Sequence, residues 1–299
     1  MKKRKLTRSN LTNWMWGYGM ILPLLIGLGV FYFYPIARVF RDSFYNVGAF
    51  NKATWAGVKN YETMFADATM WSSLGNTFKY VILIVPATVF FSLVLAALLN
   101  NKIRGRGIFR VIYFIPTVTM SAAISMVWRW IFNGDFGILN YIITYLGGEA
   151  HYWLSEQSTA LLCIALVSLW MGVGYNMIIL LAGIQGIPSV YFEAATLDGA
   201  SKVRQFFKIT LPLVSPTLFF VLTTTVISTL QTFDVIYMMI PGKTTAMRYT
   251  QSIVMYFYRN AFEFSKKGYA SAIAVFLFVI IMLLTLLQMR LQKKWVVYD

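Results

Sequence analysis

Four polar side chains in otherwise apolar stretches are the residues whose types and spacing point to chemistry in this chain. Asn176 lies in a long uncharged stretch, and a second apolar stretch holds Gln231, Thr232 and Asp234 near its end. A polar group in the hydrocarbon layer of a membrane is costly, and it usually faces a cavity or the interior of a helix bundle. These residues therefore predict a path for a polar solute. Hydrogen bonding between helices is the alternative role for each of them, and Asp234 could instead lie at the outer interface.

Catalytic and metal chemistry have little support in the sequence. The single cysteine, Cys163, lies in an apolar run and has no partner for a disulfide within the chain. The single histidine, His151, lies in a polar loop without a second ligand, which predicts a surface residue rather than a metal site. The chain has no His-Glu-x-x-His, Gly-x-Ser-x-Gly or Walker lysine motif. We therefore predict a protein that is not an enzyme, holds no metal or cofactor and cannot hydrolyse ATP itself.

The elements that must position the polar residues have the composition of membrane spans. Apolar residues make up 58% of the chain and charged residues 12%, and the mean hydropathy is +0.63. About twenty apolar residues are needed to cross the hydrocarbon core, where a helix satisfies its own backbone groups. We predict an all-α integral membrane domain over residues 14–290, with six transmembrane helices in the regions 14–37, 80–101, 111–128, 157–192, 209–240 and 268–289.

Basic residues set the predicted orientation of these spans. The tail 1–13, the loop after the second span, the loop 185–208 and the tail 291–299 all carry lysine or arginine, which favours the cytoplasm for them and for both termini. The segment 243–267 is also basic, although the same scheme leaves it outside. The first span is too long for a signal peptide, and we expect it to stay uncleaved. Flanks that meet anionic lipid explain the net charge of +15, so no nucleic-acid partner is expected.

The segment 185–212, between the fourth and fifth spans, has the pattern of two short helices joined by a turn. Ala194 and Ala195 favour a helix of little bulk, and Gly199 permits the sharp turn that ends it. A second, amphipathic piece with three basic residues follows before the next span begins. We predict a helix-turn-helix at the cytoplasmic surface of the membrane.

This loop resembles the EAA motif of the permease subunits of binding-protein-dependent ABC importers, and the resemblance covers about residues 70–290. The matching positions are Glu193, Ala194, Ala195, Gly199, Ile209, Leu211 and Pro212. The resemblance implies a type I ABC importer permease fold, in which the loop docks as a coupling helix into a separate ATPase subunit. It also implies that ATP and Mg²⁺ are bound by that partner. The residues it places at the contact are Glu193, Ala194, Ala195, Asp198 and Gly199.

Three further segments, 127–133, 170–176 and 198–200, resemble carbohydrate importers of the maltose, multiple-sugar and glycerol-phosphate type. The chain looks like the first permease subunit of the maltose importer, although it lacks that subunit's extra N-terminal spans and large inserted outer domain. Tyr175 joins the four candidate substrate contacts, because an aromatic face stacks on a sugar ring and its hydroxyl can bond a sugar hydroxyl. In the related maltose permease, residues aligned with Tyr175 and with the Gln231 region contact sugar.

The resemblance implies an assembly with a related second permease, two ATPase subunits and an extracytoplasmic solute-binding protein, in the plasma or inner membrane. An oligosaccharide is the expected substrate, and a glycerol phosphate ester or a polyol is the alternative. A third alternative is an ion-coupled secondary transporter, which commonly has ionisable residues in its spans. Asp234 alone fits that description here, which favours the ATP-driven importer.

Overall fold

The computed structural model describes residues 8–48, 52–101, 104–242 and 244–297, and this part of the chain is mostly helical, with two short strands. It divides into two compact units, one made of Met1–Met64 and Asn260–Val275 and the other of Phe65–Arg259 and Phe276–Asp299. Four helices are long and apolar enough to cross a membrane, and there are up to six spans if each of two bent helix pairs counts as one. The prediction of an all-α membrane fold is confirmed.

The first unit contains a long helix and a small hairpin. Helix α1 (Arg8–Leu28) continues through a π-helical turn, Gly29–Phe33, into α2 (Tyr34–Asp42). Its apolar window is not buried by other parts of the described chain, which suits a helix surrounded by lipid. Strands β1 (Tyr45–Val47) and β2 (Ala53–Trp55) then pair antiparallel, with Tyr45 opposite Trp55.

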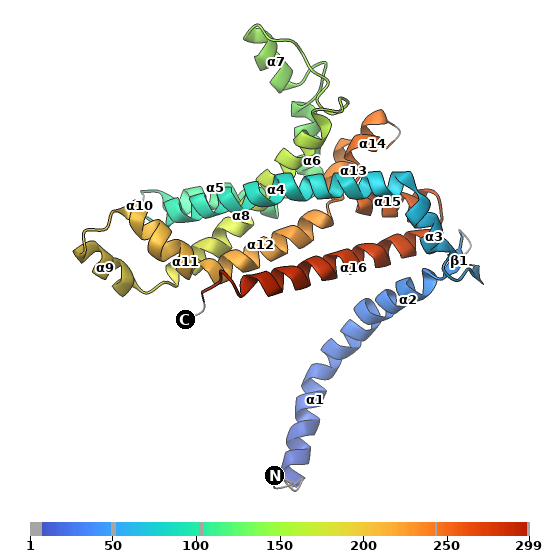
Figure 1. Ribbon diagram of the computed structural model, residues 1–299, viewed down its shortest axis with the longest axis horizontal. Helices are drawn as coiled ribbons and strands as arrows, with labels where there is room; N and C mark the ends of the chain where they lie inside the picture. Colours follow the sequence, from blue (N-terminus) through green and yellow to red (C-terminus); the bar gives the residue numbers. More distant parts are fainter. Residues whose placement is uncertain (1–7, 49–51, 102–103, 243, 298–299) are drawn as a thin grey trace. The chain divides into compact units, whose positions relative to one another are not determined.

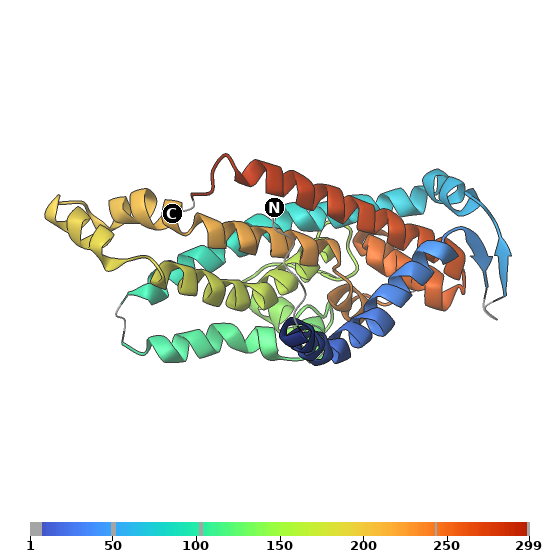
Figure 2. The same ribbon diagram turned by 90° about the horizontal axis from the view of Figure 1, so that it is seen from below.

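The second unit is a helix bundle centred on α4 (Ala68–Asn100). Helices α8 (Ala160–Gln185) and α12 (Ser215–Leu230) pack along α4, and α5 (Arg106–Val118) packs on α8 (Figures 1 and 2). The last helix, α16 (Lys267–Gln292), runs through parts of both units. The shorter helices are α3 (Lys59–Ala66), α6 (Ser121–Ile131), α7 (Ile138–Tyr145), α9 (Ser189–Leu197), α10 (Lys202–Gln205), α11 (Leu211–Leu213), α13 (Asp234–Met239), α14 (Thr245–Thr250) and α15 (Ile253–Tyr258), with π-helical turns at Phe206–Thr210 and Arg259–Glu263.

The contact between α5 and α8 depends on a glycine. A Cβ atom placed on Gly174 would lie 1.9 Å from the backbone oxygen of Tyr113, far inside van der Waals distance. The two backbones can therefore approach this closely only because position 174 has no side chain. Small residues at helix contacts are the usual means of close packing in membranes.

Gly174→Ala is expected to force α5 and α8 apart and to lower the free energy of unfolding by about 2 kcal/mol, the usual cost of overpacking a filled contact. Gly172→Ala is the matched control, because a Cβ there meets only the Thr88 methyl group, at 3.6 Å. Thermal unfolding of both variants in one detergent measures the difference. Equal midpoints for the two variants would contradict the close contact.

The third predicted span, 111–128, is not a single helix. Helix α5 ends at Val118 and α6 begins at Ser121, and the pair is bent by 97°. Pro116 in the last turn of α5 has no N–H to donate to the preceding turn, and Thr119 takes extended backbone angles. Non-helical backbone at membrane depth is tolerated beside a cavity, and the helical residues on the two sides of this break, Thr117 and Ser121, line the cavity described below.

The fifth predicted span, 209–240, is bent by 67° between Leu213 and Ser215, and it also ends early. Helix α12 ends at Leu230, and the next helix, α13, begins at Asp234. In the intervening turn, the Thr232 hydroxyl donates to the Thr229 carbonyl at 2.8 Å, and hydroxyls that bond the preceding turn compete with the helical backbone. The polar segment between the helices is therefore a break in the span.

Candidate functional site

A cavity of about 530 Å³ lies in the second unit, beside the two breaks just described. It is lined by residues of α4, α5, α6, α8 and α12 and by the segment 231–235. Four of the five predicted substrate contacts line it, namely Asn176, Gln231, Thr232 and Asp234. The fold thus brings together polar residues that lie in two different spans of the sequence.

Asn176 has partners in the helix bundle. Its buried amide nitrogen donates to the Gly172 carbonyl at 3.1 Å and to the Thr225 hydroxyl of α12 at 3.3 Å. The amide oxygen accepts no hydrogen bond from the described residues. Both roles considered for this residue are therefore compatible with its geometry, because one end of the amide joins two helices and the other end stays available at the cavity.

Asp234 connects the two breaks. It is the first residue of α13, and its Oδ2 accepts a hydrogen bond of 3.4 Å from the Ser121 hydroxyl at the start of α6. Among the described residues that line the cavity it is the one with a charge. Across the described chain, no cluster of three His, Cys, Asp or Glu side chains is placed to hold a metal ion. The cavity offers hydrogen bonds and a single carboxylate.

Two residues at the cavity, Thr88 and Ser168, were not predicted from the sequence. The hydroxyls of Thr88 on α4 and Ser168 on α8 are buried and have no partner in the described chain. Buried polar groups are nearly always hydrogen-bonded, so these two hydroxyls are unsatisfied groups at the edge of the cavity. Residue type gave no signal for either position, because serine and threonine are common in membrane helices and usually bond their own backbone.

Tyr175 lies elsewhere. It is on α8, next to Asn176, but it does not line the cavity, and half of its side chain is exposed. Successive residues of a helix point about 100° apart, since the helix has 3.6 residues per turn. The structure therefore does not bring Tyr175 together with the other four candidates.

The loop 185–212 forms the expected helix-turn-helix, seen at one end of the bundle in Figure 1. Gly199 follows α9 with a left-handed φ of +74°. Its N–H donates to the Thr196 carbonyl at 3.1 Å, and the N–H of Ala200 donates to the Ala195 carbonyl at 2.9 Å. This is the Schellman arrangement that closes a helix with glycine.

A buried glutamine holds the two short helices together. The Gln205 amide, on α10, donates to the Thr196 hydroxyl of α9 and to the Ala200 carbonyl, both at 3.1 Å. The outer surface of α9 is open: Glu193, Ala194 and Asp198 are exposed, and Leu197 is 90% exposed. The two short helices of the loop are thus held together by hydrogen bonds, and α9 exposes apolar and acidic side chains.

Comparison with known proteins shows which family the chain resembles. The model for "Binding-protein-dependent transport system inner membrane component" matches residues 88–297. The probable ABC transporter permease protein YesP of Bacillus subtilis is 36% identical over 301 aligned residues, which cover 100% of this chain and 96% of the relative. The sulfoquinovosyl glycerol permease SmoG of Agrobacterium fabrum is 33% identical, covering 91% and 88%. The trehalose/maltose permease MalF of Thermococcus litoralis is 30% identical, covering 93% of each chain.

A solved structure has the same fold. The chain is similar to a bacterial ABC transporter involved in the import of the acidic polysaccharide alginate, with a TM-score of 0.85 over 96% of this chain and 98% of that one. The two sequences are 21% identical.

Proposed function

Because the chain belongs to the binding-protein-dependent transport system inner membrane components, we propose that it is a permease subunit of an ATP-driven importer. In this proposal it forms half of the translocation path for an oligosaccharide. Relatives named for trehalose and maltose, lactose and arabinooligosaccharides support a sugar as the solute. The observation that carries the proposal is the polar cavity at two broken spans.

The chemistry of the cavity suits a neutral, hydroxyl-rich solute. The unpaired hydroxyls of Thr88 and Ser168 can each donate and accept, and the Asn176 oxygen and the Asp234 carboxylate can accept from sugar hydroxyls. A glycerol phosphate ester fits less well, because its anionic group would meet Asp234 and no lysine or arginine among the described lining residues. An oligosaccharide is therefore the preferred substrate, with a polyol as the alternative.

In this proposal, the loop 185–212 couples this cavity to ATP hydrolysis in a separate subunit. One end of the loop adjoins the end of α8, the other reaches α12 through a bend of 67° between Leu213 and Ser215, and both helices line the cavity. From Asn176 to the end of α8 at Gln185 is about 14 Å along the helix. A force on the loop would reach the cavity along α8, and along α12 by way of the bend after Leu213. In the proposal, Glu193, Ala194, Ala195, Asp198 and Gly199 contact the ATPase subunit, which binds ATP and Mg²⁺.

The proposed assembly contains this chain, a second homologous permease, two ATPase subunits and an extracytoplasmic solute-binding protein. In the proposed orientation the loop and both termini lie in the cytoplasm, and the basic flanks support this. The segment between α6 and α8 then lies outside, on the side of the solute-binding protein.

Thr88→Val tests the cavity. If the hydroxyl binds the solute, the half-saturating sugar concentration for ATP-dependent uptake rises by about tenfold, the effect of losing roughly one hydrogen bond. Thr223→Val is the matched control, because its hydroxyl is also buried without a partner in the described chain but does not line the cavity. Uptake by proteoliposomes measures both. If both variants took up sugar as the unaltered protein does, the Thr88 hydroxyl would not contact the solute. A rise in stability would then show only that an unpaired buried hydroxyl had been removed.

A further inference from the structure

The bend between the loop 185–212 and α12 is produced by a proline. Residues Lys202–Leu213, here called the arm, form one helical stretch, and α12 follows it at an angle of 67°. A straight helix would need an N–H at position 216 to donate to the Pro212 carbonyl, and Pro216 has none. The ring of Pro216 would also clash with that carbonyl. The proline breaks the helix, but a missing hydrogen bond does not by itself fix the angle.

A buried serine bonds the carbonyl that Pro216 cannot reach. The Ser215 hydroxyl donates to the Pro212 carbonyl at 2.6 Å, and it accepts a hydrogen bond of 2.9 Å from the backbone N–H of Val297. Ser215 is buried, so water does not compete for these bonds. A chain of two hydrogen bonds therefore connects the segment after α16 to the arm, across the first turn of α12.

The segment 293–297, here called the strap, follows α16 and lies against α12. In Figures 1 and 2 the end of α16 lies beside α11 and the start of α12. The ring of Trp295 meets the ring of Phe219 edge-on, with the two centroids 6.1 Å apart. Farther along, two residues of α16 pack against a core cluster that includes Leu230 of α12. The strap is thus held to α12 by an aromatic contact as well as by the Val297 hydrogen bond.

The start of α12 is also held by α8. A Cβ atom placed on Gly183, in the last turn of α8, would lie 2.5 Å from the Thr217 hydroxyl oxygen. The two helices are therefore in close contact just after the bend. The arm, in contrast, exposes Val203 and Phe207. Because one side of the bend is anchored and the other is open, a displacement of the loop acts first on the angle between them.

We propose that the strap locks this bend, so that a movement of the loop turns α12 instead of changing the angle between the arm and α12. The inference rests on the proposed function, in which the ATPase subunit moves the loop. Ser215 does not line the cavity, so Ser215 and Val297 are positioning residues that act through the arm. Without the lock, the arm would follow the ATPase while α12 stayed behind, and ATP would be hydrolysed without transport.

Val297→Pro removes the N–H that bonds Ser215, and it is expected to lower the amount of sugar transported per ATP hydrolysed about fivefold. That factor is the change in population produced by losing roughly one hydrogen bond. Val297→Ala is the matched control, because it keeps the N–H and shortens an exposed side chain. Ser215→Ala should reproduce the loss, and Ser215→Thr, which keeps a hydroxyl, should restore most of it. Oligosaccharide uptake and ATP hydrolysis are measured in the same proteoliposomes, with the complete complex and the solute-binding protein.

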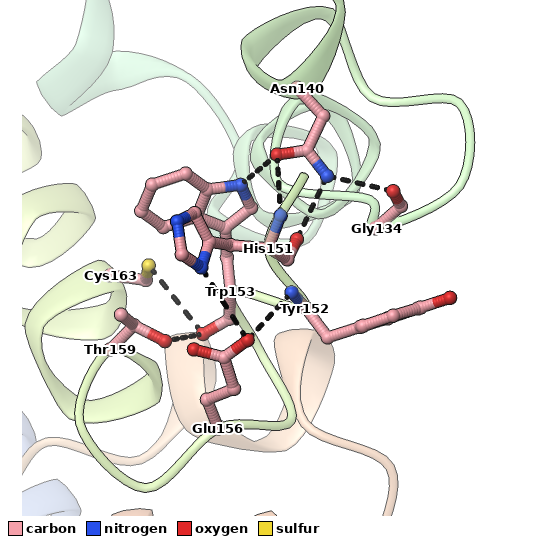
Figure 3. A network of polar contacts seen from close by, with 8 residues as sticks. All are labelled: Gly134, Asn140, His151, Tyr152, Trp153, Glu156, Thr159 and Cys163. Carbon is pink, nitrogen blue, oxygen red and sulfur yellow. Dashed lines mark hydrogen bonds and ion pairs between the residues drawn. The ribbon is translucent and has the colours of Figure 1, made fainter. Parts of the chain in front are cut away.

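A distance measurement tests the lock without relying on transport. Spin labels are placed on cysteines at Arg204 in the arm and Phe220 in α12, both of which are exposed, with the buried Cys163 changed to alanine. Val297→Pro is expected to broaden the distribution of distances between the labels. Asn140→Ala is the control for lost stability, because it removes four hydrogen bonds between α6 and α8, away from the bend (Figure 3). It should leave the distribution unchanged.

Three results would overturn the inference. The first is an equal ratio of transport to hydrolysis in the Val297→Pro and Val297→Ala complexes while ATP-driven uptake persists, which leaves the proposed function intact. The second is an unchanged distance distribution in Val297→Pro. The third is a similar broadening in Asn140→Ala, because the bend would then respond to lost stability in general. Absence of ATP-driven uptake by the unaltered complex would instead reject the proposed function, and the coupling role of the strap with it.

Discussion

Gly199→Val is expected to reduce ATP-driven uptake about 30-fold without unfolding the permease. The backbone at this position has φ +74°, and a side chain there costs about 2 kcal/mol, which corresponds to a factor of about 30 in population. The turn would open and lose the hydrogen bonds from the N–H groups of Gly199 and Ala200. Helix α9 would then no longer present Glu193 and Asp198 in one arrangement to the ATPase.

The experiment compares sugar uptake and retention of the ATPase subunit in complexes purified through the permease. Gly199→Asn is the conservative control, because asparagine tolerates left-handed backbone angles better than other residues with a side chain. We expect it to keep most of the uptake. Full uptake by the valine variant would show that the shape of the turn does not matter for coupling.

Asn176→Leu is expected to lower stability and to weaken solute binding at the cavity. It removes the hydrogen bond of 3.3 Å to the Thr225 hydroxyl, which joins α8 to α12, and it removes the amide oxygen from the cavity. Loss of a buried polar partner costs about 2 kcal/mol of stability. If the amide also binds the solute, the half-saturating sugar concentration measured on folded protein rises by about tenfold.

A double-mutant cycle with Thr225→Val separates the two roles of Asn176. Thermal unfolding gives the coupling energy between the two side chains, because each single change breaks the same hydrogen bond. We expect the stability losses of the two single variants to be less than additive. Asn176→Leu could instead lower the stability and leave the half-saturating sugar concentration of the folded protein unchanged. Asn176 would then serve helix packing alone.

The fold was largely predictable because apolar length is a strong signal. The long helices α4, α8 and α16 lie where the uncharged stretches placed them, and the loop 185–212 has the turn that Gly199 indicated. A membrane imposes one rule on every span, namely that backbone groups must bond within the helix. Spans that obey this rule can be found by counting residues.

The breaks in two spans were not predictable from hydropathy. Pro116 is a common residue type in membrane helices, and nothing in the apolar pattern shows that the chain turns by 97° after Val118. A helix may break only where other parts of the protein satisfy its free backbone groups or line a cavity with it, so the break depends on tertiary structure. The run of Gln231, Thr232 and Asp234 was read as polar residues within a helix, whereas α12 ends before them.

The membership of the cavity was only partly predictable. Asn176, Gln231, Thr232 and Asp234 stood out because their side chains are unusual among apolar neighbours, but Thr88 and Ser168 did not. Which face of a helix meets the cavity depends on its rotation against its neighbours, so Tyr175 could not be placed from its position beside Asn176. Only packing decides these cases.

The most direct test of the central claim is uptake of radiolabelled oligosaccharides by proteoliposomes that contain the complete complex, with ATP supplied on the side of the loop 185–212. We predict uptake that requires ATP and the solute-binding protein and that is lost in Glu193→Ala while the complex still assembles. Uptake driven by an imposed ion gradient, without ATP and without sensitivity to changes in the loop, would contradict this account and identify a secondary transporter.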